Sequence, residues 1–536
     1  SIEIIDLNGQ GNTLTLANDD ILSIVGTIAE NDLKVKGSSS DSVVISSTGF
    51  NSIGQATTID SVTYDIYTNQ NHDSTVRLLI QQGITVTEPT LTTIELSNIE
   101  NGHGGGFAIN GISTYDLSGI TVSDAGDVNG DGLNDIIIGA PTNEGRTDKG
   151  ESYVVFGTTS GTTIELSNVE NGTGGFIING ASSDDYAGVS VNSAGDVNGD
   201  GLDDVIVSAH KDDPNGSASG ASFVVFGKTT TTAVELSNVD NGTGGFVMNG
   251  VANGDLSGTS VSGAGDVNSD GLDDLIIGAR SDDPNGSLSG ASFVVFGQTS
   301  TSSIELSNIQ NSTGGFVING VTNNDGSGRV VSDAGDVNGD GLADVIVGAK
   351  GADINGSASG SSYVVFGKTN TTDVELSDVN SGTGGFSING VTNNDARGVS
   401  VSNAGDVNGD GLDDLIVGSA SRDSHGGDSG TSYVIFGKTS GTTVELSDIE
   451  NGTGGFNING VTASDKSGYS VSHAGDVNGD GLADLIIGAY GDSPNGSGSG
   501  ASFVVFGQTA STTIELSNIE NGTGGFVING ITNDDQ

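Results

Sequence analysis

Short runs of apolar residues alternate with polar, glycine-rich segments along most of this 536-residue chain. One unit begins with Val189–Val191, continues through Val205–Val207 and Ser222–Phe226, and ends with Phe246–Asn249. The run Phe223-Val224-Val225-Phe226 is apolar at every position, which is typical of a strand buried on both faces. Helical periodicity is nearly absent, so the pattern predicts an all-β protein in which sheets cover sheets.

A nine-residue stretch separates the first two runs of each unit and recurs at intervals of 69 or 70 residues. A period of this length indicates a repeat architecture. Four-stranded units stacked around an axis predict a β-propeller. A linear β-solenoid is the main alternative, but its repeats are usually much shorter. The stretch begins at Asp127, Asp196, Asp266, Asp336, Asp406 and Asp476.

The chemistry of this stretch is that of a calcium loop. Oxygen-bearing side chains occupy positions 1, 3, 5 and 9, a glycine occupies position 6, and the carbonyl of position 7 can add a further oxygen. Calcium takes about 6–8 oxygen ligands. Two carboxylates about 4 Å apart repel by about 4 kcal/mol at an effective dielectric near 20, and a divalent ion removes that cost. An acidic turn without metal is the alternative.

The loop is not an EF-hand, because position 12 is Ile138 instead of a bidentate Glu and the flanking residues are β-branched. It therefore joins two strands. The pattern predicts about six bound Ca²⁺ ions. The predicted ligands are Asp127, Asn129, Asp131, Leu133 and Asp135; Asp196, Asn198, Asp200, Leu202 and Asp204; Asp266, Asn268, Asp270, Leu272 and Asp274; Asp336, Asn338, Asp340, Leu342 and Asp344; Asp406, Asn408, Asp410, Leu412 and Asp414; and Asp476, Asn478, Asp480, Leu482 and Asp484.

Composition limits the partners and the compartment. The net charge is −54, with 69 acidic against 15 basic residues, so the surface repels nucleic acid and anionic lipid. There is no cysteine, which excludes disulfides and thiol nucleophiles. No signal peptide or long apolar run is visible, and membrane insertion is not expected. Calcium sites of moderate affinity favour an extracellular or cell-surface location.

Residues 1–90 do not share the repeat and predict a small β-rich module, with 91–536 as the repeat array. Glu88-Pro89-Thr90 is the expected linker, and Asn18–Ala29 is a candidate short helix. The pattern around Leu7–Val25 and Leu33–Val44 resembles a module of large bacterial surface proteins exported by type I secretion. The expected strands are Ser1–Asp6, Thr13–Leu16, Asp32–Lys36, Ser42–Ser46, Val62–Tyr67 and Thr75–Gln81.

The array resembles a known family. Gly188–Val191, the loop Asp196–Asp204 and Phe223–Phe226 are similar to the FG-GAP repeat of the integrin alpha-subunit propeller, and Gly139-Ala140-Pro141 matches its second signature. The resemblance covers roughly Thr93–Gln536 and implies a calcium-binding propeller with ligands at loop positions 1, 3, 5, 7 and 9.

The array departs from that family in two respects. Ser269 replaces glycine at position 4 of the third loop, and all six units keep the loop, whereas integrins keep it in only some blades. No inserted metal-binding domain is present, so integrin-type ligand capture is not implied.

The number of blades is left open by the sequence. The sequence contains seven predicted fourth-strand segments of the type Ile-Glu-Leu-Ser-Asn but only six sets of strands one to three. By analogy with seven-bladed integrins, we expect a seventh blade completed by strands that follow Gln536 in a longer protein. A ring of six with a spare strand, or completion by a neighbouring chain, are the alternatives. The segments start at Ile94, Ile164, Val234, Ile304, Val374, Val444 and Ile514.

A four-stranded meander places its first and third turns at one end, so the loops after the second strand and the blade connections lie opposite the calcium loops. The copies differ most there. Drift in exposed loops explains this simply, and a binding surface for a protein or glycan is the alternative. The variable residues are Pro141, His210, Arg280, Lys350, Ala420 and Tyr490 after the second strands, and Tyr115, Tyr186, Leu256, Gly326, Ala396 and Lys466 in the connections.

Of twelve Lys and Arg residues in the array, eight lie in these two sets of loops. Their concentration on an otherwise acidic protein favours the binding surface. These eight are Arg146, Lys149, Lys211, Arg280, Lys350, Arg397, Arg422 and Lys466.

The sequence therefore predicts an extracellular, calcium-stabilised adhesion or binding scaffold of a bacterial surface or secreted protein. Its five histidines occupy unrelated positions in the repeat, so no catalytic residue, enzyme activity or organic cofactor is expected. One alternative is a filament or sheath subunit that self-associates by strand addition. Another is a propeller hydrolase or lyase with non-repeated His, Arg, Tyr or Asp side chains around its channel.

Overall fold

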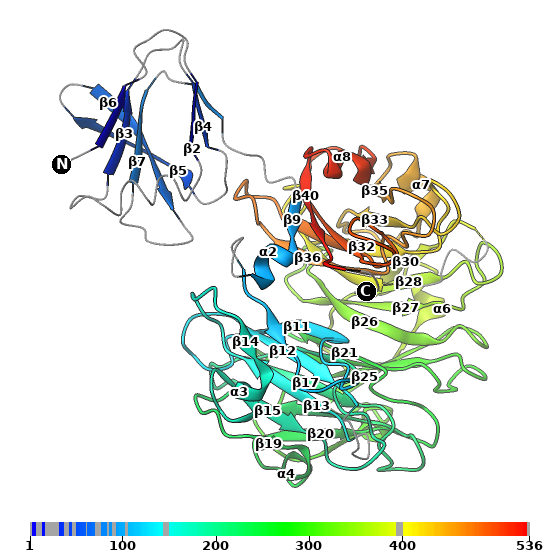
Figure 1. The fold of residues 1–536 in the computed structure, drawn as a ribbon. Coiled ribbons are helices and arrows are strands. Elements are labelled where there is room, and N and C mark those ends of the chain that lie inside the picture. Colours follow the sequence, from blue (N-terminus) through cyan, green and yellow to red (C-terminus); the bar gives the residue numbers. More distant parts are fainter. Residues whose placement is uncertain are drawn as a thin grey trace. The chain divides into compact units, whose positions relative to one another are not determined.

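The computed structural model describes residues 3–6, 13–16, 32–36, 42–45, 50–59, 62–69, 77–82, 85–87, 93–101, 106–142, 149–392 and 400–532 (Figure 1). The chain divides into two compact units, Ser1–Phe107 and Ala108–Gln536. The predicted linker Glu88-Pro89-Thr90 and the candidate helix Asn18–Ala29 lie outside the described residues.

The first unit contains two β-sheets, with strand orders β1-β3-β7-β6-β5 and β2-β4-β8. Val35, Tyr64, Leu78 and Leu79 are buried in it. A strand overlaps each of the six predicted segments, whereas β5 and β8 were not predicted. The elements are β1 (Glu3–Asp6), β2 (Thr13–Leu16), β3 (Asp32–Lys36), β4 (Ser42–Ile45), β5 (Phe50–Ile59), β6 (Val62–Asn69), β7 (Arg77–Gln81), β8 (Thr85–Thr87), β9 (Thr93–Glu95) and α2 (Leu96–Glu100).

The second unit is a β-propeller, as expected, with six complete blades that follow one another in chain order from cyan to red in Figure 1. Each blade is an antiparallel four-stranded meander. The first strands are β11 (Thr121–Gly126), β16 (Val191–Gly195), β21 (Ser260–Gly265), β26 (Ser327–Gly335), β31 (Ser400–Gly405) and β36 (Ser470–Gly475). The second strands are β12 (Asp135–Ala140), β17 (Asp204–Ala209), β22 (Asp274–Ala279), β27 (Asp344–Ala349), β32 (Asp414–Ser419) and β37 (Asp484–Ala489).

The outer half of each blade is formed by a third and a fourth strand. The third strands are β13 (Glu151–Val155), β18 (Ala221–Val225), β23 (Ala291–Val295), β28 (Ser361–Val365), β33 (Thr431–Ile435) and β38 (Ala501–Val505). The fourth strands are β15 (Gly175–Asn179), β20 (Gly245–Asn249), β25 (Gly315–Asn319), β30 (Gly385–Asn389), β35 (Gly455–Asn459) and β40 (Gly525–Asn529).

The middle strands of a blade are the most buried, which explains their continuous apolar runs. Every residue of β17 and of β18 is buried. The glycine that opens each fourth strand is required by a close approach: at Gly245, with φ +155°, a Cβ would lie 1.9 Å from the Val224 carbonyl oxygen. The next residue, Phe246, packs edge-to-face against Phe226 at 6.0 Å between ring centroids.

The prediction that Ile-Glu-Leu-Ser-Asn forms the fourth strand is wrong. Its first two residues form a short strand that extends the sheet of the preceding blade, because Val234 and Glu235 pair in parallel with Ile178 and Asn179. The Leu that follows starts a helical turn, and Leu236 and Val239, three positions apart, are both buried. The fourth strand is the Gly-Phe-x-x-Asn segment that follows the turn, which confirms the predicted run Phe246–Asn249.

These connections recur in every repeat of the propeller. A two-residue strand that precedes the first blade, β10 (Ile109–Asn110), pairs with β14 in the same way. The short strands are β14 (Ile164–Glu165), β19 (Val234–Glu235), β24 (Ile304–Glu305), β29 (Val374–Glu375), β34 (Val444–Glu445) and β39 (Ile514–Glu515). The helical turns are α3 (Leu166–Glu170), α4 (Leu236–Asp240), α5 (Leu306–Ile309), α6 (Leu376–Val379), α7 (Leu446–Glu450) and α8 (Leu516–Glu520).

Candidate functional site

Each predicted calcium loop is a tight turn organised by the carboxylate at its first position. In the second loop, Asp196 Oδ1 accepts hydrogen bonds from the backbone N–H groups of Gly199 at 2.7 Å and Asp200 at 3.0 Å. Asp196 Oδ2 accepts one from Gly201 N at 2.9 Å. Gly201 at position 6 has a φ of +87°, which glycine adopts readily. The sequence of the loop therefore fixes its turn as predicted.

The ninth position anchors the loop in the blade. Asp204 is fully buried at the start of β17, and its carboxylate accepts hydrogen bonds from Val197 N at 3.2 Å and Gly227 N at 2.8 Å. Asn198 Nδ2 also donates to Asp204 Oδ2, at 3.1 Å. This one carboxylate thus ties the loop to the residues that follow the third strand.

The carboxylates of each loop act on one another electrostatically. Burial, and then the neighbouring carboxylates of Asp200 and Asp196, raise the pKa of Asp204 to about 8. The same causes raise the pKa of Asp274 to about 8 and those of Asp344 and Asp414 to about 7. A cation placed among these oxygens would lower such pKa values, because an opposite charge favours the ionised form.

The loop donors fit calcium in type, since they are all oxygens from carboxylates, an amide and a backbone carbonyl. They are not gathered into a ready-made cluster. Across the described ranges, no three Asp, Glu or His side chains lie together closely enough to hold a metal ion by themselves. Asn198 presents its amide nitrogen to Asp204, so ligation by its oxygen needs half a turn of the amide.

Consecutive loops are hydrogen-bonded to each other, which the sequence analysis missed. Asp203, at position 8 of the second loop, accepts a hydrogen bond from Asp127 N in the first loop at 2.7 Å. Its own backbone N–H donates to the Asp127 carbonyl oxygen at 3.3 Å. The side-chain link recurs from Asp273 and Asp413, whereas position 8 is alanine in the fourth and sixth loops. That alternation of Asp and Ala was the available signal.

The loops that follow the second strands lie at the opposite end of the blades. Because the first two strands of a blade are antiparallel, a residue after the second strand lies level with the start of the first strand. In the sixth blade this brings together Tyr469 and Tyr490, whose ring centroids are 4.7 Å apart. Of the predicted variable residues, Arg146, Ala396 and Arg397 lie outside the described part of the chain.

Comparison with known proteins identifies the repeat. The FG-GAP repeat family matches residues 121–155, 323–365, 397–435 and 467–505, which belong to the first, fourth, fifth and sixth blades. Four of the six blades therefore contain an FG-GAP repeat. The predicted resemblance is therefore confirmed for the repeats.

Two curated relatives are integrin alpha chains. Integrin alpha-4 of Xenopus laevis is 30% identical over 159 residues, which are 29% of this chain and 14% of the relative. Integrin alpha-PS2 of Drosophila melanogaster is 31% identical over 163 residues, 29% of this chain and 11% of the relative. The matched segment thus spans a small part of either relative, and the likeness supports an integrin-like propeller.

The cations of the propeller fall into distinct environments. Arg422 binds Glu450 at 2.9 Å, and Lys466 lies 3.7 Å from Asp428. Lys211 packs over the ring of Tyr186, 4.1 Å from its centroid. Three lysines outside the variable loops stack on phenylalanine rings of the preceding blade; these are Lys228, Lys368 and Lys438.

Arg329 is a cation of this face that the sequence analysis did not single out. It lies near the start of β26 in the fourth blade, where the matching residue of the second blade is Val189. A Cβ added at Gly278 would lie 2.0 Å from the Gly328 carbonyl oxygen, so the segments that carry Arg280 and Arg329 lie side by side. The Arg329 guanidinium lowers the pKa of Arg280, after the larger effect of burial. A comparison of the six first strands position by position would have revealed it.

The inner strands surround a channel of about 800 Å³ lined by polar side chains. Non-repeated residues lie on it, including Asp124, Asp333, Asn403 and His473. Asp333 accepts a hydrogen bond from Asn403 Nδ2 at 3.0 Å, which ties two neighbouring blades together. No catalytic arrangement follows from these contacts.

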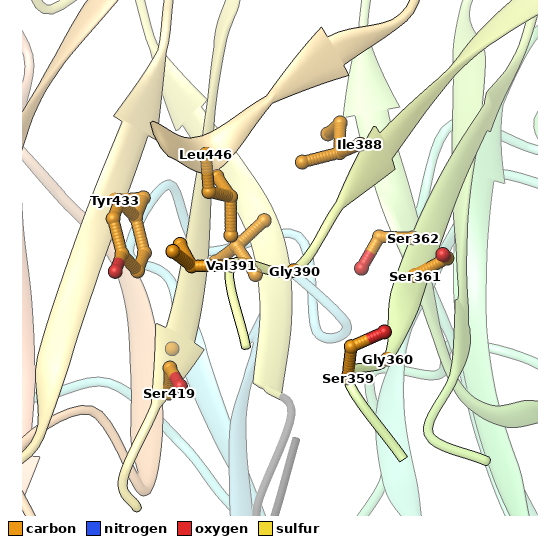
Figure 2. A pocket seen from close by; sticks show the side chains of 12 residues that line it. Ser359, Gly360, Ser361, Ser362, Ile388, Gly390, Val391, Ser419, Tyr433 and Leu446 are labelled. Carbon is orange, nitrogen blue, oxygen red and sulfur yellow. The ribbon is translucent and has the colours of Figure 1, made fainter. Parts of the chain in front are cut away.

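A second, much smaller cavity lies between the fourth and fifth blades. Figure 2 shows the hydroxyl groups of Ser361, Ser362 and Ser419 and the side chains of Ile388 and Tyr433 around it. Its volume of about 20 Å³ suits a single water molecule and excludes a larger ligand. Within the residues that the structure describes, no helix is long and apolar enough to cross a membrane.

Proposed function

We propose that this propeller is an extracellular binding scaffold of an adhesion protein, with its ligand on the face opposite the predicted calcium loops. One observation carries the proposal: the six loops keep the same oxygen-bearing residues, whereas the opposite face carries side chains found in one blade only. His210, Arg280, Arg329 and the Tyr469–Tyr490 pair are such side chains. The likeness to two integrin alpha chains supports a protein as the ligand.

The proposed setting is the surface of a bacterium or its surroundings. It is supported by the acidic composition, which suits a medium with salt and calcium, and by the pattern in residues 1–90. The scaffold is proposed to act without catalysis, so its affinity and specificity come from the variable loops.

Calcium is proposed to act structurally, with about six ions bound. In each loop the residues at positions 1, 3, 5, 7 and 9 would hold the ion, which supplies positive charge among the carboxylates. The chain's own contacts would extend its effect, because Asp204 joins the loop to the third strand and Asp203 joins it to the preceding blade. A stabilised loop face would then keep the opposite face rigid.

A calorimetric calcium titration of chelator-stripped protein tests the structural role. We expect about six equivalents to bind and the melting temperature to rise sharply, since an ion that binds only the folded state stabilises it. Absence of binding, or binding without a rise in melting temperature, would show that the loops are acidic turns only.

Adhesion to a panel of immobilised extracellular proteins and glycans tests the ligand face. We expect the double variant Tyr469→Ser/Tyr490→Ser and the double variant Arg280→Gln/Arg329→Gln each to reduce adhesion to at least one member of the panel. The control Ser300→Ala changes an exposed loop on the calcium-loop side and should leave adhesion unchanged. If the control and both double variants adhere equally, the ligand face is assigned wrongly.

A further inference from the structure

Basic residues occupy one rim of the propeller across three consecutive blades. His210 follows β17, Arg280 follows β22, and Lys350 follows β27, all directly after the second strand. Arg329 stands near the start of the first strand in the same blade as Lys350. The three other blades have proline, alanine and tyrosine after the second strand. Basic side chains therefore mark this rim in half of the propeller, although the chain carries 69 acidic against 15 basic residues. Carboxylates follow in the same loops, at Asp212, Asp213, Asp282, Asp283 and Asp353.

Burial and neighbouring cations disfavour the protonated forms of His210 and Arg280. Burial lowers the pKa of His210 to about 4, and the nearby charges of Lys211 and Arg280 contribute to the shift. Burial and the charge of Arg329 lower the pKa of Arg280. With a pKa of about 4, His210 is neutral at pH 7, so Arg280 and Arg329 carry the positive charge. The three side chains lie at the same end of adjacent blades, from the second to the fourth, and we call them the cationic row.

The cationic row has hydrogen-bonding capacity that the described protein does not use. The Nδ1 atom of His210 and the Nε atom of Arg280 are buried and have no hydrogen-bond partner among the described residues. Within the same part of the chain, neither Arg280 nor Arg329 forms an ion pair. Buried polar atoms are normally hydrogen-bonded, so a small turn of either side chain toward a ligand with matching polar groups would satisfy these atoms.

Arg422 shows what a satisfied arginine looks like on the same face. Its Nη2 atom donates to Glu450 Oε1 at 2.9 Å and its Nε atom donates to the same oxygen at 3.2 Å. Tyr433 also donates its hydroxyl hydrogen to Glu450, at 2.8 Å. The chain therefore provides carboxylate partners for one arginine of this face and leaves the two arginines of the cationic row without them.

We propose that His210, Arg280 and Arg329 bind the carboxylate groups of an acidic peptide segment in a protein ligand. The inference rests on the proposed function and names the chemistry of its ligand. Arginine matches carboxylates because its planar fork of donors can bind both oxygens at once. Basic side chains spaced over three blades suit an extended segment that presents several carboxylates in succession.

A peptide fits this row better than an acidic glycan does. Sugar rings are commonly held by an aromatic face, and the tyrosine of the second blade beside the row is Tyr186. Lys211 covers that ring at 4.1 Å from its centroid, so the face is already occupied. Carboxylate recognition by the arginines needs no such face.

Fluorescence anisotropy with a labelled oligoglutamate peptide tests this inference, with an oligoglutamine peptide of equal length as the neutral probe. The measurement is made at about 0.15 M salt, where the Debye length is about 8 Å and distant acidic residues are screened. We expect the intact protein to bind oligoglutamate and not oligoglutamine. The double variant Arg280→Gln/Arg329→Gln should bind it at least about tenfold more weakly, the effect of losing charged hydrogen bonds.

Two further variants make the test specific. Arg422→Gln removes an arginine of the same face that is already paired, and it should change the affinity by less than about twofold. Arg280→Lys keeps the charge but loses the fork, and it should give an intermediate affinity. Equal binding of the two peptides, or equal affinity in Arg280→Gln/Arg329→Gln and Arg422→Gln, would overturn the inference. So would binding of oligogalacturonate through the two arginines without binding of oligoglutamate.

Failure of this inference can be told apart from failure of the ligand face. If Tyr469→Ser/Tyr490→Ser abolishes adhesion to the protein and glycan panel while Arg280→Gln/Arg329→Gln keeps it, the ligand face stands and the cationic row is not its binding site. If neither double variant changes adhesion, the face itself is wrong.

Discussion

The first and sixth blades, at the two ends of the array, have nearly the same sequence as the four blades between them but different surroundings. Each end blade has one open flank, where no neighbouring blade covers it in the described part of the chain. The valine at position 2 of the loop is at most 1% exposed in the first five loops and 50% exposed in the sixth. The valine in the middle of the first strand is at most 5% exposed in the last five blades and 62% exposed in the first. The two exposed residues are Val477 and Val122. Local sequence therefore sets the strand, while the neighbouring blade decides whether its face is covered.

The loops show the same contrast. A Cβ added at Gly126 would lie 2.2 Å from Asp203 Oδ2 of the next blade, whereas at the matching Gly475 it would meet nothing within 4 Å among the described residues. In the first five blades the next loop also donates a backbone hydrogen bond, such as the one from Asp203 N to the Asp127 carbonyl oxygen at 3.3 Å. An inner loop is therefore supported on both sides and the sixth loop on one.

The largest expected difference concerns calcium. If the loops bind calcium as proposed, an inner loop should hold the ion more tightly than the sixth loop, because its shape is fixed by the next blade. A ligand at about 100 times its dissociation constant adds about 2.7 kcal/mol of stability. We expect Asp196→Asn to lower the free energy of unfolding in millimolar calcium by more than Asp476→Asn does. Urea denaturation of both variants measures this, and equal losses would contradict the contrast.

The second-largest expected effect is the pH dependence of the stability of the metal-free protein. The pKa of Asp204 is raised to about 8, so the folded state holds a proton that the unfolded state releases above about pH 4. Its contribution to stability is complete below that pH and is lost as the pH rises toward 8. The pKa of Asp135, on the blade with an open flank, is raised only to about 6.

Urea denaturation in chelator at several pH values checks this expectation. Stability should fall from pH 4 to 8, and Asp204→Asn should flatten the fall more than Asp135→Asn does above about pH 6. A profile that rises over this range would mean that the buried carboxylates are ionised in the folded protein. Calcium should reduce the fall if it binds these groups.

Truncation of the valine at position 2 of the loop should have a smaller effect on the free energy of unfolding. It should still distinguish a covered loop from an open one. Val197→Ala removes two buried methyl groups and leaves a space in the core between the second and third blades, so we expect a loss of about 2 kcal/mol. Val477→Ala changes an exposed side chain and should cost less than about 0.5 kcal/mol. Denaturation midpoints of the pair measure the difference. Losses of similar size would show that Val477 is covered in solution.

The link between loops should give the smallest effect. Asp203→Ala leaves the backbone N–H of Asp127 without its partner, which costs about 1–2 kcal/mol. Ala343→Asp introduces the same link between the third and fourth loops, and we expect it to add up to about 1 kcal/mol. Thermal unfolding of both variants checks the sign. A destabilising Ala343→Asp would show that the added charge outweighs the hydrogen bond.

Much of the propeller could be predicted because each repeat carries its own local signals. The apolar runs of β17 and β18 and the loop glycine Gly201 act through neighbouring residues, so their roles are visible in the sequence. Leu236 was misassigned because a two-residue strand followed by one helical turn has no period of its own. Only the packing of Leu236 and Val239 beneath the sheet reveals it.

The candidate site was predicted less completely, because its contacts join residues about one repeat apart. Asp203 binds the loop of the preceding blade, and Arg329 lies beside Arg280 of the preceding blade. Neither relation can be read from the composition of a single repeat. Both could be sought by comparing copies position by position, since each residue departs from the pattern of its counterparts.

The parallel pairing of β19 with β15 means that the repeat of the sequence and the blade of the structure have different boundaries. Each period of the sequence finishes the edge of one blade before it starts the next, and Asn179 Nδ2 fastens this overlap by donating to Glu235 Oε1 at 2.8 Å. A deletion of the residues between the first and fourth strands of one blade would also remove the short strand that forms the edge of the preceding blade. Removal or insertion of one full period, from any starting point, preserves every such overlap. Whole repeats can thus be added or removed without a new kind of contact between blades.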